Sequence, residues 1–354
     1  MSANDRTEAE GVSFVMPVLN ERDYLEHAVR SVLAQDIDGP TELVLALGPS
    51  TDGTTELAQQ LAAGDERLRL VDNPAAHIPV GLNAAIRASR YPTIIRVDAH
   101  SELSPGYASL ALATLNRTGA ANVGGVMRAE GRTPFQRAVA RLYNSPIGLG
   151  GGAYHGSDRE GAAESAYLGV MRRDVLDEVG LFDETIRRGE DWELNLRIRQ
   201  AGHLVWFDPQ LSVTYWPRES WWRLARQFRA TGAWRGELVR RFGRSNGLRF
   251  FAPPALVIVT ALAAVVGLLQ LTGVLSGIAR VVASLVYLPL LAYAILIVAV
   301  GVSGGKGMRE RLWTMAALPT MHISWGMGFL AGVMRGAGDT IDASRLGDRN
   351  TPLP

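Results

Sequence analysis

Short apolar runs alternate with stretches of helical spacing over roughly the first hundred residues. Runs of strand length occupy residues 12–17, 42–47, 68–72 and 93–98. Between them, residues 23–34, 54–63 and 80–89 repeat their apolar side chains at intervals of three and four, which is the spacing of one helix face. Strands that alternate with helices predict a parallel sheet with helices on both of its faces.

Polar clusters follow three of these strands. They read Asn20-Glu21, Ser50-Thr51-Asp52 and Asp98-Ala99-His100. In open α/β sheets, ligands bind beyond the carboxyl ends of the strands. We therefore expect these clusters to border a binding site.

The pattern is less regular from residue 119 to residue 215. Residues 134–143 and 191–201 have helical spacing, residues 148–161 form a glycine-rich loop, and residues 204–215 are typical of a strand. We interpret residues 12–215 as one α/β domain. The polar tail before it, residues 1–11, lacks the apolar core of a signal peptide.

A basic, tryptophan-rich segment follows at residues 216–250. From Trp216 to Arg249 it has nine Arg and two Glu with no Lys or Asp, and four Trp are interleaved with the arginines. This composition is typical of an amphipathic helix in the headgroup layer of an anionic membrane. Nucleic-acid binding is the alternative, which we disfavour because apolar segments follow at once.

Three apolar segments, residues 252–271, 281–302 and 312–334, make up a predicted membrane domain over residues 251–335. Each approaches the ~20 residues that a membrane-spanning helix needs. The third contains Pro319, His322 and Ser324, so a kinked, re-entrant or interfacial helix is an alternative to a full crossing. A polar tail, residues 336–354, ends the chain.

Positive charge predicts how these segments are oriented. Arginines precede the first segment, and Lys306, Arg309 and Arg311 lie between the second and third. Because such loops stay on the cytoplasmic side, we expect a multi-pass protein of the bacterial inner (plasma) membrane with a cytoplasmic catalytic domain.

Overall composition excludes several kinds of site. The chain of 354 residues has no cysteine, which excludes disulfides, thiolate metal sites and cysteine nucleophiles. Its net charge of +1 gives no indication of nucleic-acid binding. The sequence does not indicate an oligomeric state.

Asp98 and His100 are candidate ligands of a divalent cation. Both follow the apolar run 93–97 and lie two residues apart, so both side chains can point the same way. A carboxylate and an imidazole beside diphosphate oxygens suit Mn²⁺ or Mg²⁺. The alternative is that these residues only cap the following turn.

Asp191 is a candidate general base. The pair Glu190-Asp191 opens a predicted helix after Gly189, where acidic residues also stabilise a helix dipole without any catalytic role. A base must be ionised, and we expect a nearby arginine, Arg187, Arg188 or Arg197, to favour the charged form.

The motifs together resemble family 2 glycosyltransferases, and most closely the ExoA-like bacterial enzymes of succinoglycan-type polysaccharide synthesis. The resemblance covers residues 12–241. It rests on Pro17-Val-Leu-Asn-Glu21, Gly48-Pro-Ser-Thr-Asp-Gly-Thr54, Gly81-Leu-Asn83, Arg96-Val-Asp-Ala-His100, Ser145-Pro-Ile-Gly-Leu-Gly-Gly-Gly152, Tyr167-Leu-Gly-Val170 and Glu190-Asp-Trp-Glu-Leu-Asn-Leu-Arg197, in this order.

The resemblance implies an α/β fold of the nucleotide-diphospho-sugar transferase type, GT-A, with a mostly parallel central sheet and an inverting single displacement. It puts Asp191 at the general base and Asp98 with His100 at the metal. Residues implied at the donor are Pro17, Asn20, Glu21, Asp52, Asn83, Arg96 and Asp98. Gln227, Arg229 and Arg235 fall where many relatives close over the diphosphate, with a purely interfacial role as the alternative.

One departure concerns the nucleobase. Many relatives have paired aspartates at the end of the second strand, where this chain has Leu47-Gly48. Either the nucleotide differs, or the backbone and Glu21 contact the base instead. Glycine there permits close approach of the backbone.

We thus expect a metal-dependent inverting hexosyltransferase that moves a sugar from a nucleotide-diphospho-sugar to a polyprenyl-diphosphate-linked glycan. A membrane anchor raises the effective concentration of a lipid-linked acceptor. One alternative is a polyprenyl-phosphate sugar synthase. Another, from a different class, is a catalytically silent nucleotide-sugar-binding scaffold, which the missing aspartate pair motivates.

Overall fold

The computed structural model describes residues 11–149, 159–243, 246–338 and 340, in two compact units. The first unit comprises residues 1–129 and 151–216, and the second comprises residues 130–150 and 217–354. Residues 130–150, expected within the α/β domain, therefore belong to the second unit. Most of the two predicted polar tails and much of the glycine-rich loop lie outside the described residues.

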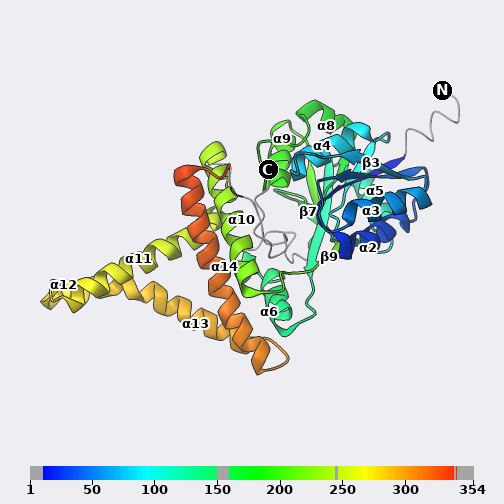
Figure 1. Ribbon diagram of the computed structural model, residues 1–354. Coiled ribbons are helices and arrows are strands. Elements are labelled where there is room, and N and C mark those ends of the chain that lie inside the picture. Colours follow the sequence, from blue (N-terminus) through cyan, green and yellow to red (C-terminus); the bar gives the residue numbers. More distant parts are fainter. Residues whose placement is uncertain (1–10, 150–158, 244–245, 339, 341–354) are drawn as a thin grey trace. The chain divides into compact units, whose positions relative to one another are not determined.

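The first unit is built on a mixed sheet in which the longest pairings are parallel (Figure 1). Its main path has the order β3-β2-β1-β4-β8-β6-β9-β5, with β7 paired to β9. The strands are β1 (Val12–Val18), β2 (Thr41–Leu47), β3 (Leu68–Asp72), β4 (Thr93–Arg96), β5 (Glu102–Leu103), β6 (Asn122–Ala129), β7 (Gly161–Ala162), β8 (Val170–Arg172) and β9 (Val205–Tyr215).

Helices cover both faces of this sheet, as the alternating pattern predicts. On one face α2 (Arg22–Leu33), α3 (Thr54–Gly64) and α5 (Tyr107–Thr118) form a hydrophobic core with the strands. On the other face lie α4 (Ile78–Ala88), α8 (Arg173–Val179) and α9 (Glu190–Gln200), with a separate core. Successive residues of β2 alternate between the two cores, because side chains along a strand point to opposite faces.

Several elements differ from the sequence-based expectation. The fourth strand ends at Arg96 rather than at residue 98, and α5, α8 and β6 have no expected counterpart. Strand β6 contains Gly124 and Gly125, which weaken any strand pattern. A Cβ at Gly125 would lie 1.8 Å from the carbonyl oxygen of Leu211, so this strand needs glycine to approach β9.

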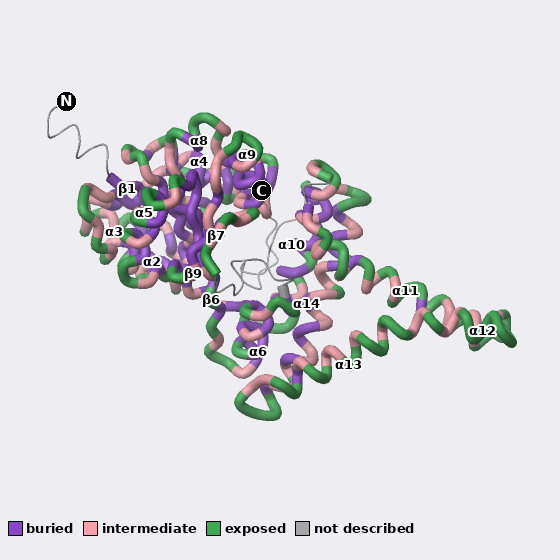
Figure 2. Tube along the Cα trace, turned by 180° about the vertical axis from the view of Figure 1, so that it is seen from behind, coloured by how far each residue is buried: buried purple, intermediate pink, exposed green. Residues whose placement is uncertain are grey.

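The second unit is helical. Its elements are α6 (Pro134–Tyr143), α7 (Pro146–Leu149), α10 (Trp221–Phe242), η3 (Leu248–Phe251), α11 (Ala252–Leu271), α12 (Gly277–Ala283), η4 (Ser284–Val286), α13 (Tyr287–Ser303) and α14 (Met308–Arg335). Helices α11 and α13 expose apolar side chains along most of their length, whereas α10 and α14 each have a larger buried share (Figure 2).

Glycines bring α10 and α14 into backbone contact. Gly232 and Gly236 of α10 lie against the α14 backbone at Trp325 and Phe329. A Cβ on Gly332 would lie 1.9 Å from the carbonyl oxygen of Ala233, and one on Gly328 would lie 2.0 Å from that of Arg229. Paired small residues at four-residue spacing permit such close crossings of helices. The apolar face of α10, expected to lie on a membrane, therefore packs on α14.

Two stretches of the described chain, Leu248–Leu271 and Gly277–Ser303, are long and apolar enough to cross a membrane. The third expected segment corresponds to α14, which is not among these candidate membrane spans. It packs against α10 and α6. His322 of α14 has partners at both ring nitrogens, because Tyr293 Oη lies 2.9 Å from Nδ1 and the Ile147 carbonyl oxygen 3.1 Å from Nε2. This histidine therefore links α14 to α13 and to α7.

Candidate active site

Arg96, the last residue of β4, gathers three carboxylates at the carboxyl end of the sheet. Its Nη1 lies 2.6 Å from Oδ1 of Asp191 and 2.9 Å from Oε1 of Glu190. Its Nε and Nη2 lie 3.3 and 3.2 Å from Oδ1 of Asp98. We call these four residues the Arg96 cluster. The sequence predicts a donor contact for Arg96, but the guanidinium is buried and engaged by the acids.

Two of these acids, Glu190 and Asp191, lie at the start of α9. Gly189 turns the chain with a φ of 82°, and Glu190 and Asp191 then occupy the first helical turn. Their negative charges are stabilised there by the helix dipole. Both side chains also reach across to β4, so stabilisation of the helix is not their whole role. Arg197, one of the arginines expected beside Asp191, bonds Glu193 at 2.7 Å instead.

Burial and charge act against each other in the cluster. Burial alone would lower the pKa of Arg96, but the three carboxylates outweigh it and hold that pKa well above the usual value. Burial raises the pKa of Asp191 to about 7, and the charges of Glu190 and Asp98 add to this effect while Arg96 opposes it. Asp191 therefore exchanges a proton near neutral pH, which suits a general base.

Asp191 has one oxygen available. Its Oδ1 bonds Arg96, whereas Oδ2 has no hydrogen-bond partner among the described residues. The side chain is 24% exposed, compared with 8% for Glu190. Of the two acids at the start of α9, Asp191 is thus the one that a hydroxyl group can reach.

Asp98 and His100 share a turn directly after β4. The turn is closed by the backbone, with Ser101 N donating to the Asp98 carbonyl at 2.9 Å. The Asp98 carboxylate accepts from Arg96, and His100 Nδ1 lies 2.9 Å from Glu21 Oε1. Among the described residues, no group of three or more His, Cys, Asp or Glu side chains forms a complete metal site.

The loops after β1 and β2 are hydrogen-bonded to each other. Asn20, with a φ of 53°, accepts from Thr51 N through Oδ1 at 2.8 Å, and its own N–H donates to Ser50 Oγ at 3.0 Å. Asp52 accepts from Thr54 N and from Arg22 N. Burial would raise the pKa of Asp52, but these hydrogen bonds outweigh it and lower the pKa. The loops expected at the nucleoside are therefore fixed by their own contacts.

Two further donor positions have structural surroundings. Pro17 lies within β1, in register with Ala46 of β2. Asn83 is buried, and its amide bonds the Phe182 backbone in both directions and Glu184 at 2.9 Å. These bonds tie α4 to the segment before α9.

Gly48 stands where many relatives have an aspartate. A Cβ there would lie 3.0 Å from Leu19 Cδ1 and 3.3 Å from the Val18 carbonyl oxygen. The side chain of Leu19 therefore occupies the space beside Gly48. A larger residue at position 48 needs Leu19 to shift.

The three candidate diphosphate residues lie on α10, in the second unit. Gln227 is buried and accepts from Tyr143 Oη at 3.2 Å, while Arg229 is exposed. The guanidinium of Arg235 stacks 4.0 Å above the ring centre of Phe250 and bonds Asn246 at 3.3 Å. These contacts give Gln227 and Arg235 a structural role within the unit.

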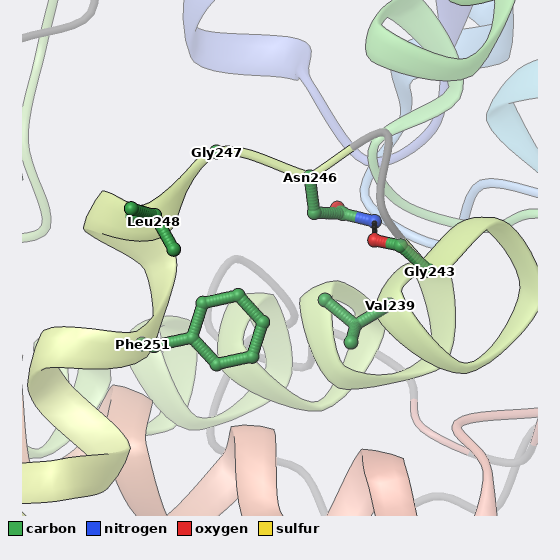
Figure 3. Close-up of a pocket in the computed structure, with 6 residues that line it drawn as sticks. All are labelled: Val239, Gly243, Asn246, Gly247, Leu248 and Phe251. Carbon is green, nitrogen blue, oxygen red and sulfur yellow. Dashed lines mark hydrogen bonds between the residues drawn. The ribbon is translucent and has the colours of Figure 1, made fainter.

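An open pocket of about 590 Å³ lies beside the end of α10 (Figure 3). Its lining residues are Val239, Gly243, Asn246, Gly247, Leu248 and Phe251. Asn246 bonds the Gly243 carbonyl at 3.2 Å, and none of the lining residues that the structure describes is charged.

A pair of buried asparagines supports α9, and their pairing is not evident from the sequence. Asn122 of β6 donates to Asn195 Oδ1 at 2.7 Å, and Asn195 donates to the carbonyl oxygen of Asp191 at 2.7 Å. The motif from Glu190 to Arg197 contains Asn195, but its partner lies 73 residues earlier. These bonds fix the backbone of Asp191.

Comparison with known proteins gives consistent matches. Residues 13–180 match the family described as Glycosyl transferase family 2. The succinoglycan biosynthesis protein ExoA of Rhizobium meliloti (strain 1021) is 29% identical over 337 residues, which cover 93% of this chain and 96% of that protein. The dolichyl N-acetyl-alpha-D-glucosaminyl phosphate 3-beta-D-2,3-diacetamido-2,3-dideoxy-beta-D-glucuronosyltransferase of Methanococcus voltae is 22% identical over 240 residues, 65% of this chain and 74% of that one.

A solved structure has a similar fold. It is the mannosyltransferase PcManGT from Pyrobaculum calidifontis, in complex with GDP-Man and Mn²⁺. The TM-score is 0.61 at 17% identity, over 92% of this chain and 87% of that chain. At this identity the likeness shows the fold alone.

Proposed function

We propose that this chain transfers a sugar from a nucleotide-diphospho-sugar to a lipid-linked glycan, with inversion, because residues 13–180 match the family 2 glycosyltransferases. The similarity to ExoA over almost the whole of both chains supports a role in polysaccharide synthesis. The single observation that carries the chemistry is the part-exposed Asp191, held through one oxygen by Arg96.

Asp191 acts as the general base in this proposal. Its Oδ2 takes the proton of an acceptor hydroxyl while that oxygen forms a bond to the anomeric carbon of the donor. The bond between the anomeric carbon and the diphosphate oxygen breaks, and the nucleoside diphosphate leaves. A single displacement of this kind inverts the anomeric configuration. Arg96 and Asn195 hold the base in place.

Asp98 and His100 are the proposed ligands of Mn²⁺ or Mg²⁺. The described residues do not form a complete metal site made of protein ligands alone. This fits a cation that is bound by one or two protein side chains and whose coordination is completed by phosphate oxygens of the substrate. When bound, the cation neutralises the charge of the leaving diphosphate. The Mn²⁺ complex of PcManGT, a protein of similar fold, supports the use of a divalent cation.

The two apolar stretches 248–271 and 277–303 support attachment to a membrane. Exposed apolar side chains on α11 and α13 are costly in water and stable in lipid. Because Lys306, Arg309 and Arg311 follow the second stretch, we propose that the catalytic unit faces the cytoplasm. A lipid-linked acceptor is then confined to the same surface as the enzyme.

Binding of a donor panel tests the enzyme proposal. We would titrate the detergent-purified full chain with UDP-, GDP-, dTDP- and ADP-sugars, with and without Mn²⁺. Metal-dependent binding of one donor supports the proposal, and absence of binding by every donor contradicts it.

Acceptor specificity needs a separate assay. With that donor, we would compare a polyprenyl-diphosphate-linked glycan with polyprenyl phosphate alone, and determine the anomeric configuration of the product by NMR. Transfer only to polyprenyl phosphate would replace the proposed acceptor. Retention of configuration would contradict the single displacement.

A further inference from the structure

Glu21 and His100 join the loops that follow two neighbouring strands. Strands β1 and β4 are parallel and adjacent, so their carboxyl ends lie side by side. Glu21 follows β1 and His100 follows β4, and Oε1 of Glu21 lies 2.9 Å from Nδ1 of His100. The two side chains are 10% and 18% exposed. The pair is thus largely shielded from water beside Asp98.

The backbone of Glu21 is held from both sides. Its N–H donates to Thr54 Oγ1 at 2.9 Å, which ties it to the start of α3. Its carbonyl accepts from Tyr24 N at 3.0 Å and Leu25 N at 2.8 Å, which begin α2. Leu25 is fully buried in the core. Glu21 is therefore a rigid point from which a second side chain can be oriented.

The contact determines which nitrogen of His100 carries the hydrogen. An ionised carboxylate can only accept, so Nδ1 donates and Nε2 of the neutral ring keeps its lone pair. Within the described chain, Nε2 has no hydrogen-bond partner. Histidines that bind metals characteristically donate their other ring nitrogen to a carboxylate, which fixes the ring and its tautomer.

We propose that Glu21 is a positioning residue for the cation, acting through His100 rather than by contact with the nucleoside. It holds the imidazole so that Nε2 is the nitrogen offered to Mn²⁺. This inference rests on the proposed metal-dependent use of a nucleotide-diphospho-sugar. It replaces the expectation, drawn from the family resemblance, that Glu21 lies against the base.

The first test is spectroscopic and uses the unmodified full chain. Mn²⁺ with UDP, GDP, dTDP or ADP is added to the detergent-purified protein, and electron spin-echo modulation is recorded for the bound ion. We expect modulation from an imidazole nitrogen, and its loss in His100→Gln. If none of UDP, GDP, dTDP and ADP binds with Mn²⁺, both the proposed function and this inference fail. If Mn²⁺ and nucleotide bind without imidazole modulation, only this inference fails.

The second test concerns Glu21 itself. Loss of an outer-shell partner typically weakens metal binding about 10–100-fold. We expect Glu21→Ala to weaken Mn²⁺ binding to this extent in the presence of nucleotide, while metal-free nucleotide affinity is unchanged. Glu21→Gln keeps an acceptor for Nδ1–H and should retain most of the Mn²⁺ affinity. A weakened metal-free nucleotide affinity with normal Mn²⁺ binding would instead assign Glu21 to the nucleoside.

Discussion

Arg96 Nη1 lies 2.6 Å from Asp191 Oδ1, across 95 residues of sequence. The same guanidinium binds Asp98 through its other nitrogens. The proposed base and a proposed metal ligand therefore share one buried cation. A displacement of Arg96 moves both, so the position of the base depends on the part of the site that holds the donor.

Asp191→Asn should reduce transfer by about 10²–10⁴-fold, the usual contribution of a general base. The amide keeps the size of the side chain but cannot take a proton. Donor binding, measured by titration, should be nearly unchanged. Glu193→Gln is the matched control, because it also removes one negative charge from the first turn of α9. Glu193 bonds Arg197 rather than Arg96. Equal losses in both variants would indicate a helix-dipole effect instead.

Arg96→Lys should lower kcat by about 10²-fold, with a smaller rise in the KM for the donor because Asp98 is displaced as well. A lysine has one compact ammonium group and cannot bind three carboxylates in the planar geometry of a guanidinium. A small misplacement of the base costs a rate factor of this size. Steady-state kinetics separate the two constants. A large rise in KM with normal kcat would return Arg96 to the donor-binding role expected from the sequence.

Transfer should increase with pH through neutrality. Burial raises the pKa of Asp191 to about 7, and only the ionised form accepts a proton. Below this pH, kcat/KM should fall about tenfold per unit, and above it the profile should level off. Rates measured from pH 5.5 to 8.5 at constant ionic strength provide the test. A flat profile between pH 6 and 8 is incompatible with this base.

Gly332→Ala should destabilise the second unit by about 1–3 kcal/mol, the usual cost of overpacking. The new Cβ would lie 1.9 Å from the carbonyl oxygen of Ala233, and a helix backbone cannot yield easily. Thermal unfolding in detergent, followed by tryptophan fluorescence, measures the change. Gly307→Ala is the control, because a Cβ there has no neighbour within 4 Å. A similar loss of Tm in the control would contradict the proposed clash.

Much of the fold follows from local patterns. The alternation of strands and helices up to residue 98 predicts both the sheet and the helices on its two faces, because each element has its own periodicity. Strand β6 escapes prediction, since Gly124 and Gly125 serve a close approach that only the folded structure creates. The partner of α10 is likewise not predictable, because the sequence of α14, taken by itself, resembles that of a membrane segment.

The candidate site is predictable only in its parts. The motifs around Asp98 and Asp191 identify both acids, and the structure brings them to one guanidinium. Which arginine serves them depends on a pairing 95 residues apart, so the nearby Arg197 was a reasonable but wrong expectation. Asn83, implied at the donor by the resemblance, is buried and bonds Phe182 and Glu184, about a hundred residues later in the chain.

Helix α6 belongs to the second unit, and its main partner is synthesised late. Phe135 packs edge-on against Trp313 at 5.1 Å, and Arg137 and Arg141 bond Glu310 and Thr314 of α14. During translation, α6 leaves the ribosome with its apolar face uncovered. This face is covered only after α14, more than 170 residues later in the chain, has been synthesised. A truncated chain that ends before α14 never covers that face. Removing the apolar C-terminal region to obtain a water-soluble catalytic fragment should therefore yield a protein prone to aggregation.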